Sequence, residues 1–507
     1  MHSKEETWIS RLLGIVAVGA GLAIAQLLAS IKGNWRAPVV SIGNRVIDYV
    51  PASIKELAIR TFGINDKNAL VITIYFVVLV LASLIGQAYF SGRQRRAIAT
   101  VATMVALASI SALFNANSNL LSVIPALAAG GTTIWVLRAL KMRSTAGAEE
   151  NESMNRRGLL KSVGLVAIGS VGAVVVGNYL RSHASAQLQR LTIVLPKALK
   201  FLPPPPPDPA LTIPGLSRLF TPNNEFYRID TAITVPNVNL ESWRLRIDGM
   251  VANPREFTYK ELTDRPVFQL DDTIACVSNE VGGTLVGNAR WLGIRLDDLV
   301  KEASPYGSAD QVMGHSVDGF TAGFPLAALD GRDAMIAIGM NGEPLPIDHG
   351  FPARIIVPGL YGYVSATKWL TRIELTRFDR AEGYWVPRGW SAQAPIKTQS
   401  RIDTPSMGSL LKPGRRVVAG VAWAPTRGIS KVEVRVDNGT WREATLGPAL
   451  AKTTWRQWWI DWDAKRGSRT LSVRATDGTG ALQSSRSVPV APNGAEGWHT
   501  IDVTVAT

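Results

Sequence analysis

The chain has 507 residues, of which 46% are hydrophobic, and it contains a single cysteine. This length requires several domains, because one hydrophobic core rarely serves more than about 300 residues. The formal net charge of +14 is uneven: residues 1–187 hold 18 basic and 8 acidic side chains (+10), and residues 188–507 hold 36 and 32 (+4). Because the excess lies in the hydrophobic part, the charge does not indicate a nucleic-acid partner. One cysteine also excludes an intramolecular disulfide and a cysteine-only metal cluster.

Five apolar stretches near the N-terminus are each long enough to cross a bilayer as a helix, which takes about 20 residues. Arginines and lysines lie in the loop after the second stretch and in the loop before the fifth, and basic residues in short loops stay cytoplasmic. We therefore expect a multi-pass cell-membrane anchor over 1–182, with a cytoplasmic N-terminus and the remaining chain outside the cytoplasm. The predicted spans are about 11–31, 69–90, 97–114, 120–140 and 158–180.

Two further features belong to this anchor. Residues 37–62 form an amphipathic stretch that we expect to lie on the membrane surface. The predicted spans contain no histidine, and the sequence has no C-x-x-C-H motif. Since a transmembrane haem usually needs histidine ligands and an iron–sulfur cluster needs several cysteines, we predict neither haem nor iron–sulfur cluster in this chain.

The fifth stretch begins "NRRGLLKSVGLVAIG" (155–169), which resembles the twin-arginine export signal. The alternative is an ordinary basic flank of a membrane span. A twin-arginine signal would make the export machinery that carries folded proteins a partner of this chain. Cleavage after Ala186, at "ASA", and retention of the anchor both stay open, and we favour retention.

The remaining sequence changes in character twice. Five consecutive prolines in "FLPPPPPDPA" (201–210) predict a polyproline spacer within a linker over 183–216. Short strand-like and helical segments alternate over 217–398 and predict a mixed α+β domain. Alternating strands with Asn-Gly and Asp-Gly turns over 399–507 predict an immunoglobulin-like β-sandwich. The predicted fold is thus a five-helix transmembrane anchor, a mixed α+β domain and a C-terminal sandwich.

The single cysteine, Cys276, lies in "DDTIACVSNEVGG" (271–283). A free cysteine is most often a small buried hydrophobic residue, and the alternatives are a metal ligand and a nucleophile. A nucleophile would need a nearby histidine, such as His315 or His349, but no hydrolase motif surrounds the thiol. If Cys276 binds a metal, a group other than protein must supply the other soft ligands.

Several motifs occur together in the second half of the chain. They are "FYRID" (226–230), "SWRLRIDGMVANPREFTYKEL" (242–262), "IACVSN" (274–279), "NGEPLPIDHGFPARIIVPGLYGYVSATKWL" (341–370) and "QSRIDTP" (399–405). In order and spacing they resemble the sulfite oxidase family of molybdopterin enzymes, over roughly 217–500. With a five-span anchor and an internal twin-arginine signal, the chain resembles a group of actinobacterial members of that family.

The resemblance implies a molybdenum–molybdopterin cofactor, a metal ligated by Cys276, and a C-terminal domain that mediates a homodimer. It also implies that Arg228 and Tyr384 orient the substrate. The residues that it implies for binding the cofactor are Asn224, Tyr227, Arg228, Ser316, Asp318, His349, Arg354, Ser365, Thr367 and Lys368.

The substrate stays open. Sulfite-oxidising members carry an arginine soon after the metal cysteine, whereas this chain has Glu280 and Val281 there. A carboxylate beside a sulfite dianion would repel it, unless Glu280 points away from the site. We expect oxygen-atom transfer on sulfite, a sulfoxide or a similar small molecule, with a separate electron partner such as a cytochrome c or a quinol system. The alternative is a non-catalytic membrane-anchored binding protein with a vestigial molybdopterin domain.

Overall fold

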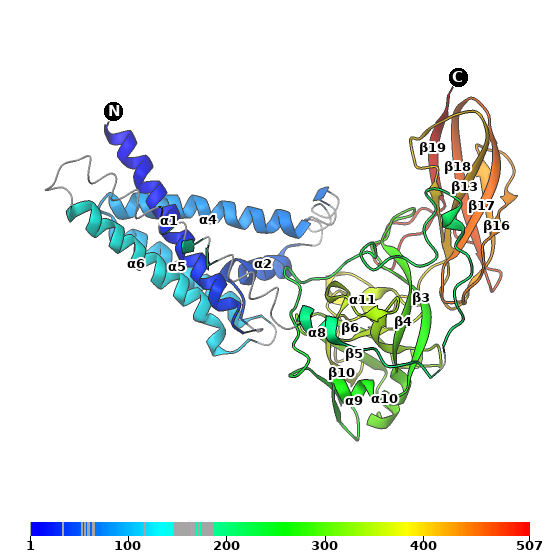
Figure 1. Ribbon diagram of the computed structural model, residues 1–507, viewed down its shortest axis with the longest axis horizontal. Coiled ribbons are helices and arrows are strands. Elements are labelled where there is room, and N and C mark those ends of the chain that lie inside the picture. The colour runs from blue at the N-terminus through cyan, green and yellow to red at the C-terminus, as the bar shows by residue number, and fades with distance from the viewer. Residues whose placement is uncertain are drawn as a thin grey trace. The chain divides into compact units, whose positions relative to one another are not determined.

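The structure is a computed structural model, which describes residues 2–32, 35–51, 54, 57, 61–62, 66–115, 118–146, 164, 166, 169–170, 172–173, 186–199 and 201–506. The chain divides into two units (Figure 1): unit 1 comprises Met1–Leu188 and Thr231–Val238, and unit 2 comprises Gln189–Asp230 and Asn239–Thr507. This boundary differs from the predicted one, because most of the predicted linker belongs to unit 2.

Unit 1 is helical. Among the described residues, four helices are long and apolar enough to cross a membrane, and they coincide with the first four predicted spans: Thr7–Ala29, Lys67–Phe90, Gln94–Leu113 and Leu120–Met142. The fifth predicted span, 158–180, lies almost entirely outside the described residues, and so does the double arginine before it. The helices are α1 (His2–Ala29), α2 (Pro38–Tyr49), α4 (Asp66–Phe90), α5 (Gln94–Leu113), the 3-10 helix η2 (Leu120–Val123) and α6 (Ile124–Ala146).

Glycines let α1 approach two other helices closely. A Cβ atom at Gly14 would lie 2.2 Å from the carbonyl oxygen of Ala82 and 2.6 Å from the Cα of Gly86, both in α4. A Cβ atom at Gly21 would lie 2.4 Å from the carbonyl oxygen of Ala129 in α6. In a bilayer, such close contact between backbones is a main source of helix association. Small residues on α1 therefore hold the bundle together.

The amphipathic stretch forms helix α2, which is too short to cross a membrane. Its Ser41 and Asn44 are bound to the end of α5 through Asn115: the Asn115 Nδ2 donates to Ser41 Oγ at 3.2 Å, and the Asn44 Nδ2 donates to Asn115 Oδ1 at 3.1 Å. This polar attachment fits a helix that packs along the bundle end and exposes Tyr49. Its predicted place on a membrane surface stays a prediction.

Unit 2 begins with two sheets. The first has the order β3-β4-β7-β8, with β9 beside β7, and all its pairs are antiparallel. The second has the order β2-β1-β10-β5-β6, in which β1 and β10 are parallel. The strands are β1 (Arg244–Gly249), β2 (Arg255–Thr258), β3 (Val267–Ala275), β4 (Val286–Arg295), β5 (Gln311–Ser316), β6 (Thr321–Pro325), β7 (Met335–Met340), β8 (Glu343–Pro344), β9 (Arg354–Ile356) and β10 (Leu370–Thr376).

Short helices precede, connect and follow these strands, and with them form a mixed α+β domain as the sequence predicted. They are α8 (Ala186–Thr192), η3 (Pro209–Leu211), α9 (Tyr259–Thr263), α10 (Leu296–Ala303), η4 (Leu326–Ala328), η5 (Ile347–His349), α11 (Gly362–Ser365) and η6 (Val386–Arg388). Helix α9 starts with a capping box, because Thr258 and Glu261 bond to each other's backbone N–H groups.

The C-terminal part of unit 2 consists of two further sheets, with the orders β11-β13-β17-β16 and β12-β19-β18-β14-β15. Val418, Trp458, Val432 and Ile501 from both sheets share one buried core. This arrangement agrees with the predicted sandwich, whose immunoglobulin-like type stays a prediction. The strands are β11 (Gln399–Thr404), β12 (Leu410–Leu411), β13 (Gly414–Trp423), β14 (Ile429–Val436), β15 (Arg442–Glu443), β16 (Thr445–Leu446), β17 (Arg456–Ala464), β18 (Gly467–Asp477) and β19 (His499–Val505).

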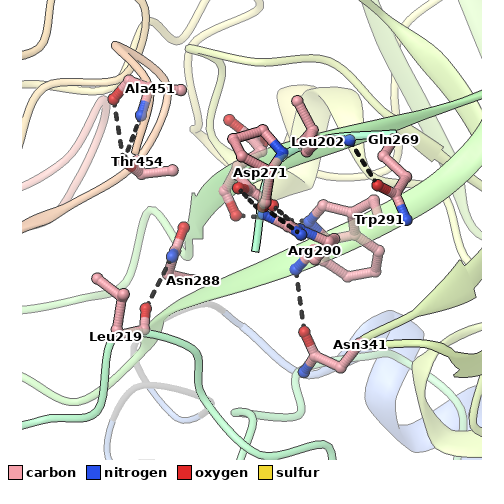
Figure 2. Close-up of polar contacts among 12 residues, drawn as sticks. Leu202, Leu219, Gln269, Asp271, Asn288, Arg290, Trp291, Asn341, Ala451 and Thr454 are labelled. Atoms are coloured by element: carbon pink, nitrogen blue, oxygen red, sulfur yellow. Dashed lines mark hydrogen bonds and ion pairs between the residues drawn. The ribbon is translucent and has the colours of Figure 1, made fainter. Parts of the chain in front are cut away.

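The proline-rich segment, predicted as a polyproline spacer, belongs to unit 2 and makes contacts along its first sheet. The Leu199 N–H donates to the Val267 carbonyl at 3.0 Å, and the Leu202 N–H donates to Gln269 Oε1 at 2.8 Å (Figure 2). β3 is the outer strand of its sheet, so these contacts cover an edge that would otherwise be open. Proline itself cannot donate to a sheet edge, but the residues that flank the prolines can.

We expect Gly14→Ala to destabilise the helical unit by about 1–3 kcal/mol, because the added methyl group must displace the backbone of α4. Gly19→Ala, in the same helix, is the matched control, since a Cβ atom there meets no atom within 4 Å. Thermal unfolding of the full chain in detergent compares the two. Equal melting temperatures for both variants would contradict the close approach of α1 and α4.

Candidate functional site

The candidate site is built on one face of the β3–β4 pair. Alternate residues of a strand share a face, so Asp272 and Ile274 point to the same side. The pairing of Ala275 with Val286 continues one residue further, because the Cys276 N–H donates to the Leu285 carbonyl at 2.9 Å. Cys276 therefore follows Asp272 and Ile274 on the same face.

The opposite face of the pair is closed by polar contacts. Arg290 donates through Nε and Nη2 to the two carboxylate oxygens of Asp271 at 2.7 and 2.8 Å, and its N–H donates to Asn341 Oδ1 at 2.9 Å (Figure 2). The Trp455 N–H of the C-terminal part donates to Thr273 Oγ1 at 2.7 Å. These contacts fix the register of β3 and therefore the face on which Cys276 lies.

Cys276 is buried, with 8% of its surface exposed. Burial raises the pKa of its thiol, and hydrogen bonds from Ser278 oppose part of that rise. A thiol with a raised pKa is a poor free nucleophile, whereas a metal removes its proton directly. The two histidines considered for a hydrolase have other partners: His315 contacts Glu374 at 2.9 Å, and His349 contacts the Asn223 carbonyl at 2.9 Å.

An aromatic layer covers the face beside Cys276. The Phe226 ring stacks on Tyr227 at 5.3 Å between centroids and meets Trp291 and His349 edge to face at 5.9 and 5.6 Å. The glycine at 287 is required here, because a Cβ atom would lie 2.6 Å from the Phe226 ring. The absence of a side chain at Gly287 thus allows the "FYRID" segment to pack on the site face.

Two tyrosines lie near the thiol. Burial raises the pKa of Tyr227, the negative charges of Cys276 and Asp272 add to the rise, and Arg354 opposes it. Tyr227 is therefore close to all three groups. Burial also raises the pKa of Tyr361 to about 12, with a smaller contribution from Cys276. Tyr361 was not among the predicted site residues, although it lies within the motif "GLYGYVS".

Two buried basic side chains gather at the other end of the face. Arg354 donates through Nη1 to the His349 carbonyl at 3.0 Å and lies over the Trp291 ring, 5.2 Å from its centroid. Burial lowers the pKa of Arg354 to about 10. Lys368 Nζ donates to Asp230 Oδ2 at 2.9 Å and to the Asp348 carbonyl at 3.1 Å, and burial lowers its pKa to about 8.

His349 is neutral in this arrangement. Its Nε2 lies 2.9 Å from the Asn223 carbonyl, an acceptor, so the proton is assigned to Nε2. Burial lowers its pKa to about 4, and the positive charge of Arg354 adds to the shift. A neutral His349 can therefore donate from Nε2 without adding a charge.

Three buried polar atoms on these elements find no hydrogen-bond partner among the described residues: Asp272 Oδ1, Arg354 Nε and Thr367 Oγ1. Buried polar groups are normally paired, so each such atom requires an explanation. A donor, an acceptor and a hydroxyl left open beside a buried thiol fit a polar ligand that brings both donors and acceptors. Molybdopterin, with its pterin ring and phosphate, has that chemistry, and the residues present fit it.

Other predicted ligands have different surroundings. Asn224 is exposed. The Ser365 hydroxyl donates to the carbonyls of Leu360 and Tyr361, both at 3.1 Å, and so stabilises the turn that carries Tyr361. Ser316 and Asp318 form the β5–β6 turn, in which Asp318 Oδ1 accepts from the Phe320 N–H at 3.1 Å. The structure thus gives Ser316, Asp318 and Ser365 structural bonds.

The two predicted substrate residues lie on different elements. Arg228 contacts two carboxylates, Asp230 at 2.8 Å and Asp348 at 3.2 Å, and it shares Asp230 with Lys368, so its positive charge is partly offset. Tyr384 packs beside the β5–β6 turn, where its N–H donates to the Thr321 carbonyl at 3.0 Å and the Arg388 guanidinium covers its ring at 3.7 Å.

The loop after Cys276 is held by the C-terminal part of the chain, a contact that sequence reasoning missed. Arg401 in β11 donates to the Gly283 carbonyl at 2.8 Å, to Asp403 at 2.6 Å and to the Ser217 hydroxyl at 2.8 Å. Gly282 has a φ of +79°, and a Cβ atom there would lie 2.2 Å from the His499 ring. No local signal links residues more than 100 positions apart.

The same loop contains Glu280, which is exposed. Its carbonyl accepts from the Gly283 N–H at 2.8 Å, which closes a tight turn. The exposed side chain favours the second sequence-based alternative, in which the carboxylate points away from the site.

We expect Arg401→Met to lower the free energy of unfolding by about 3–5 kcal/mol, because the substitution leaves the buried carboxylate of Asp403 without its cation. Arg415→Met is the matched control, since the Arg415–Asp461 pair is exposed and should contribute little. Chemical unfolding followed by tryptophan fluorescence measures both. An equal effect of the two substitutions would contradict the proposed hold on the cysteine loop.

We expect acid to destabilise the cofactor-free protein partly through His349. Its folded pKa of about 4 lies below the ordinary histidine value of 6.5, so the unfolded chain binds the proton first. The stability from neutral His349 is complete above pH 6.5 and is lost as the pH falls to about 4, by up to about 3 kcal/mol. His349→Gln keeps a donor and cannot titrate. Unfolding of this variant should take up one proton fewer, so its unfolding free energy should fall less steeply as the pH is lowered from 6.5 to 4. A slope equal to that of the wild type would refute this assignment.

Comparisons with known proteins agree with this geometry. The family model described as oxidoreductase molybdopterin binding domain matches residues 232–385. Mitochondrial sulfite oxidase of Mus musculus is 28% identical over 353 residues, which are 59% of this chain and 63% of that protein. The oxidoreductase YuiH of Bacillus subtilis (strain 168) is 31% identical over 152 residues, which are 30% of this chain and 74% of that protein.

A solved structure shows the same fold. The sulfane dehydrogenase SoxCD from Paracoccus pantotrophus superposes with a TM-score of 0.51 at 23% identity, covering 58% of this chain and 85% of that chain. The chain spans less than two thirds of the length of the mouse sulfite oxidase that it matches. From the family model, the relatives and the fold, we conclude that the chain belongs to the sulfite oxidase family of molybdopterin-binding oxidoreductases.

Proposed function

We propose that this protein is a molybdenum-dependent oxidoreductase that transfers an oxygen atom to or from a small substrate. The observation that carries the proposal is a single buried thiol on the same strand face as Asp272 Oδ1, a buried oxygen that finds no partner within the described chain. Molybdenum held by molybdopterin supplies two-electron oxygen-atom chemistry, and the protein supplies binding, orientation and electrostatics.

The proposed roles follow from the contacts. Cys276 ligates the metal, and its burial excludes water from that side. Arg354 and Thr367 offer open donors to the phosphate of the cofactor, with Lys368 and neutral His349 nearby. Tyr227, within electrostatic reach of the thiol and Arg354, borders the cofactor near the metal, and exposed Asn224 lies close to it in the chain. Ser316, Asp318 and Ser365 shape the loops around them.

The substrate class follows from charge. Arg228, the proposed substrate-orienting cation, has its charge partly offset by Asp348 and by Asp230, which it shares with Lys368. Glu280, in the metal loop, is exposed and brings no positive charge to the place where sulfite-oxidising members have an arginine. A site whose cation is partly offset by carboxylates selects less strongly for a dianion. We therefore propose a neutral or zwitterionic oxygen-atom donor or acceptor, such as a sulfoxide, ahead of sulfite, with Tyr384 as the second orienting residue.

We also propose that the protein is anchored in the cell membrane, with its N-terminus in the cytoplasm and its catalytic unit outside. Four apolar helices support the anchoring, and the arginine distribution supports the orientation. Export by the twin-arginine route would deliver a folded catalytic unit with its cofactor. The C-terminal sandwich, of immunoglobulin-like type, would mediate a homodimer, and a separate cytochrome c or quinol system would exchange electrons.

Elemental analysis by plasma mass spectrometry tests the metal. The full chain, expressed with its export signal and purified in detergent, should contain about one molybdenum per chain, since one thiolate binds one metal. Cys276→Ala should lose the metal or make it redox-silent. His315→Gln, in the other sheet, should retain it. A folded wild-type protein without molybdenum and without pterin fluorescence would refute the enzyme and leave the binding-protein alternative.

A substrate comparison then tests the charge argument. Loaded enzyme should turn over a neutral sulfoxide with a higher kcat/KM than sulfite. Asp348→Asn removes one of the two carboxylates that balance Arg228, so it should raise kcat/KM for sulfite and leave that for the sulfoxide nearly unchanged. A wild-type preference for sulfite would refute the proposed substrate class while leaving the metal site intact.

A further inference from the structure

Strand β3 carries two adjacent buried acids with opposite surroundings. Asp271, on the closed face, has both oxygens bound by Arg290. Asp272, on the site face, is 2% exposed, and its Oδ1 finds no hydrogen-bond partner in the described part of the chain. A buried carboxylate oxygen without a partner costs about 1–3 kcal/mol in folding, so a position that keeps one needs a reason.

The position of Asp272 points to a ligand. It lies four residues before Cys276 on the same strand face, which separates the two Cα atoms by about 13 Å. Burial raises the pKa of Asp272, and a hydrogen bond from the Thr273 backbone opposes part of that rise. Tyr227 lies within electrostatic reach of Cys276, Arg354 and Asp272. The open oxygen therefore belongs to the same face as the thiol and the open guanidinium nitrogen.

Charge decides which part of a ligand Asp272 can bind. A phosphate or a dithiolene sulfur would be repelled by a carboxylate, and both have better partners in Arg354, Thr367 and Cys276. What remains of molybdopterin is the pterin ring, whose amino and ring nitrogens carry hydrogens. An acceptor oxygen in a dry site suits such N–H donors.

We propose that Asp272 Oδ1 accepts a hydrogen bond from an N–H group of the pterin ring, and that Asp272 is a cofactor-recognition residue of this chain. The inference rests on the proposed function, because it requires molybdopterin on this face. It explains why β3 holds one acid with a cation and, next to it, another acid with an open oxygen. The competing explanation is a buried water molecule that satisfies the oxygen.

The test compares Asp272→Asn with Asp271→Asn, each prepared as the full chain in detergent, with cofactor and, from a host that makes no molybdopterin, without it. Pterin is measured by its fluorescence after denaturation, and cofactor-free stability by thermal unfolding. Asp272→Asn should release pterin about tenfold faster or more, since a neutral amide oxygen accepts a hydrogen bond more weakly than a carboxylate oxygen. Its cofactor-free form should be at least as stable as wild type, because burial already disfavours the charged carboxylate that asparagine replaces. Asp271→Asn should show the reverse: lower stability and normal pterin retention.

Each outcome decides the inference. Wild-type pterin retention in Asp272→Asn would overturn it, and so would pterin loss that accompanies a loss of cofactor-free stability. If Asp272→Asn does not fold, Asp272→Val, which suits a buried strand, replaces it in both assays with the same expected results. A wild-type chain that holds no pterin would instead refute the proposed function, so the two failures are distinguishable.

Discussion

The hydrogen bond from the Cys276 N–H to the Leu285 carbonyl extends the β3–β4 pairing one residue beyond the strand, and the site depends on it. A strand that slips by one residue turns every side chain to the other face, so a slip would bring Ala275 to the site and send Cys276 away. The register is fixed from the opposite face, where Asp271 pairs with Arg290 and Thr273 donates to Asn288 Oδ1 at 2.9 Å. Polar pairing on one side thus sets the geometry of the other.

The two faces of this strand pair also differ energetically. On the closed face the polar groups satisfy one another, which stabilises the fold. On the site face Asp272 keeps an open polar atom, as do Arg354 and Thr367 on other elements of the domain, and each such atom costs about 1–3 kcal/mol. Unpaired buried polar atoms persist in proteins where a bound ligand offsets their free-energy cost, and such atoms therefore concentrate at functional sites. The same reasoning explains the lowered pKa values of Arg354, Lys368 and His349, which are buried charges or potential charges near one another.

The C-terminal sandwich takes part in this site as well. Arg401 and His499 hold the loop that follows Cys276, and the Trp455 side chain donates to the Leu219 carbonyl at 2.9 Å. The proline-rich segment adds a further connection, since Asp208 accepts from Gln457 Nε2 at 2.7 Å. The sandwich and the α+β domain therefore form one structural body around the thiol. A change far away in the sandwich can alter the cysteine loop without touching a ligand.

The features that depend on local pattern could be predicted from the sequence. They are the apolar runs that form α1, α4, α5 and α6, the mixed domain, the alternating strands of the sandwich, and Cys276 as the candidate metal ligand with its family motifs. Only the folded chain shows which acids of β3 are paired, that Tyr361 lies near the thiol, that Arg228 contacts two carboxylates, and that the proline-rich segment lies along a sheet edge. These facts were out of reach because they join residues far apart in the chain. Hydrophobic periodicity specifies a buried face, but the partner of each buried polar atom is set only when distant strands pair in register.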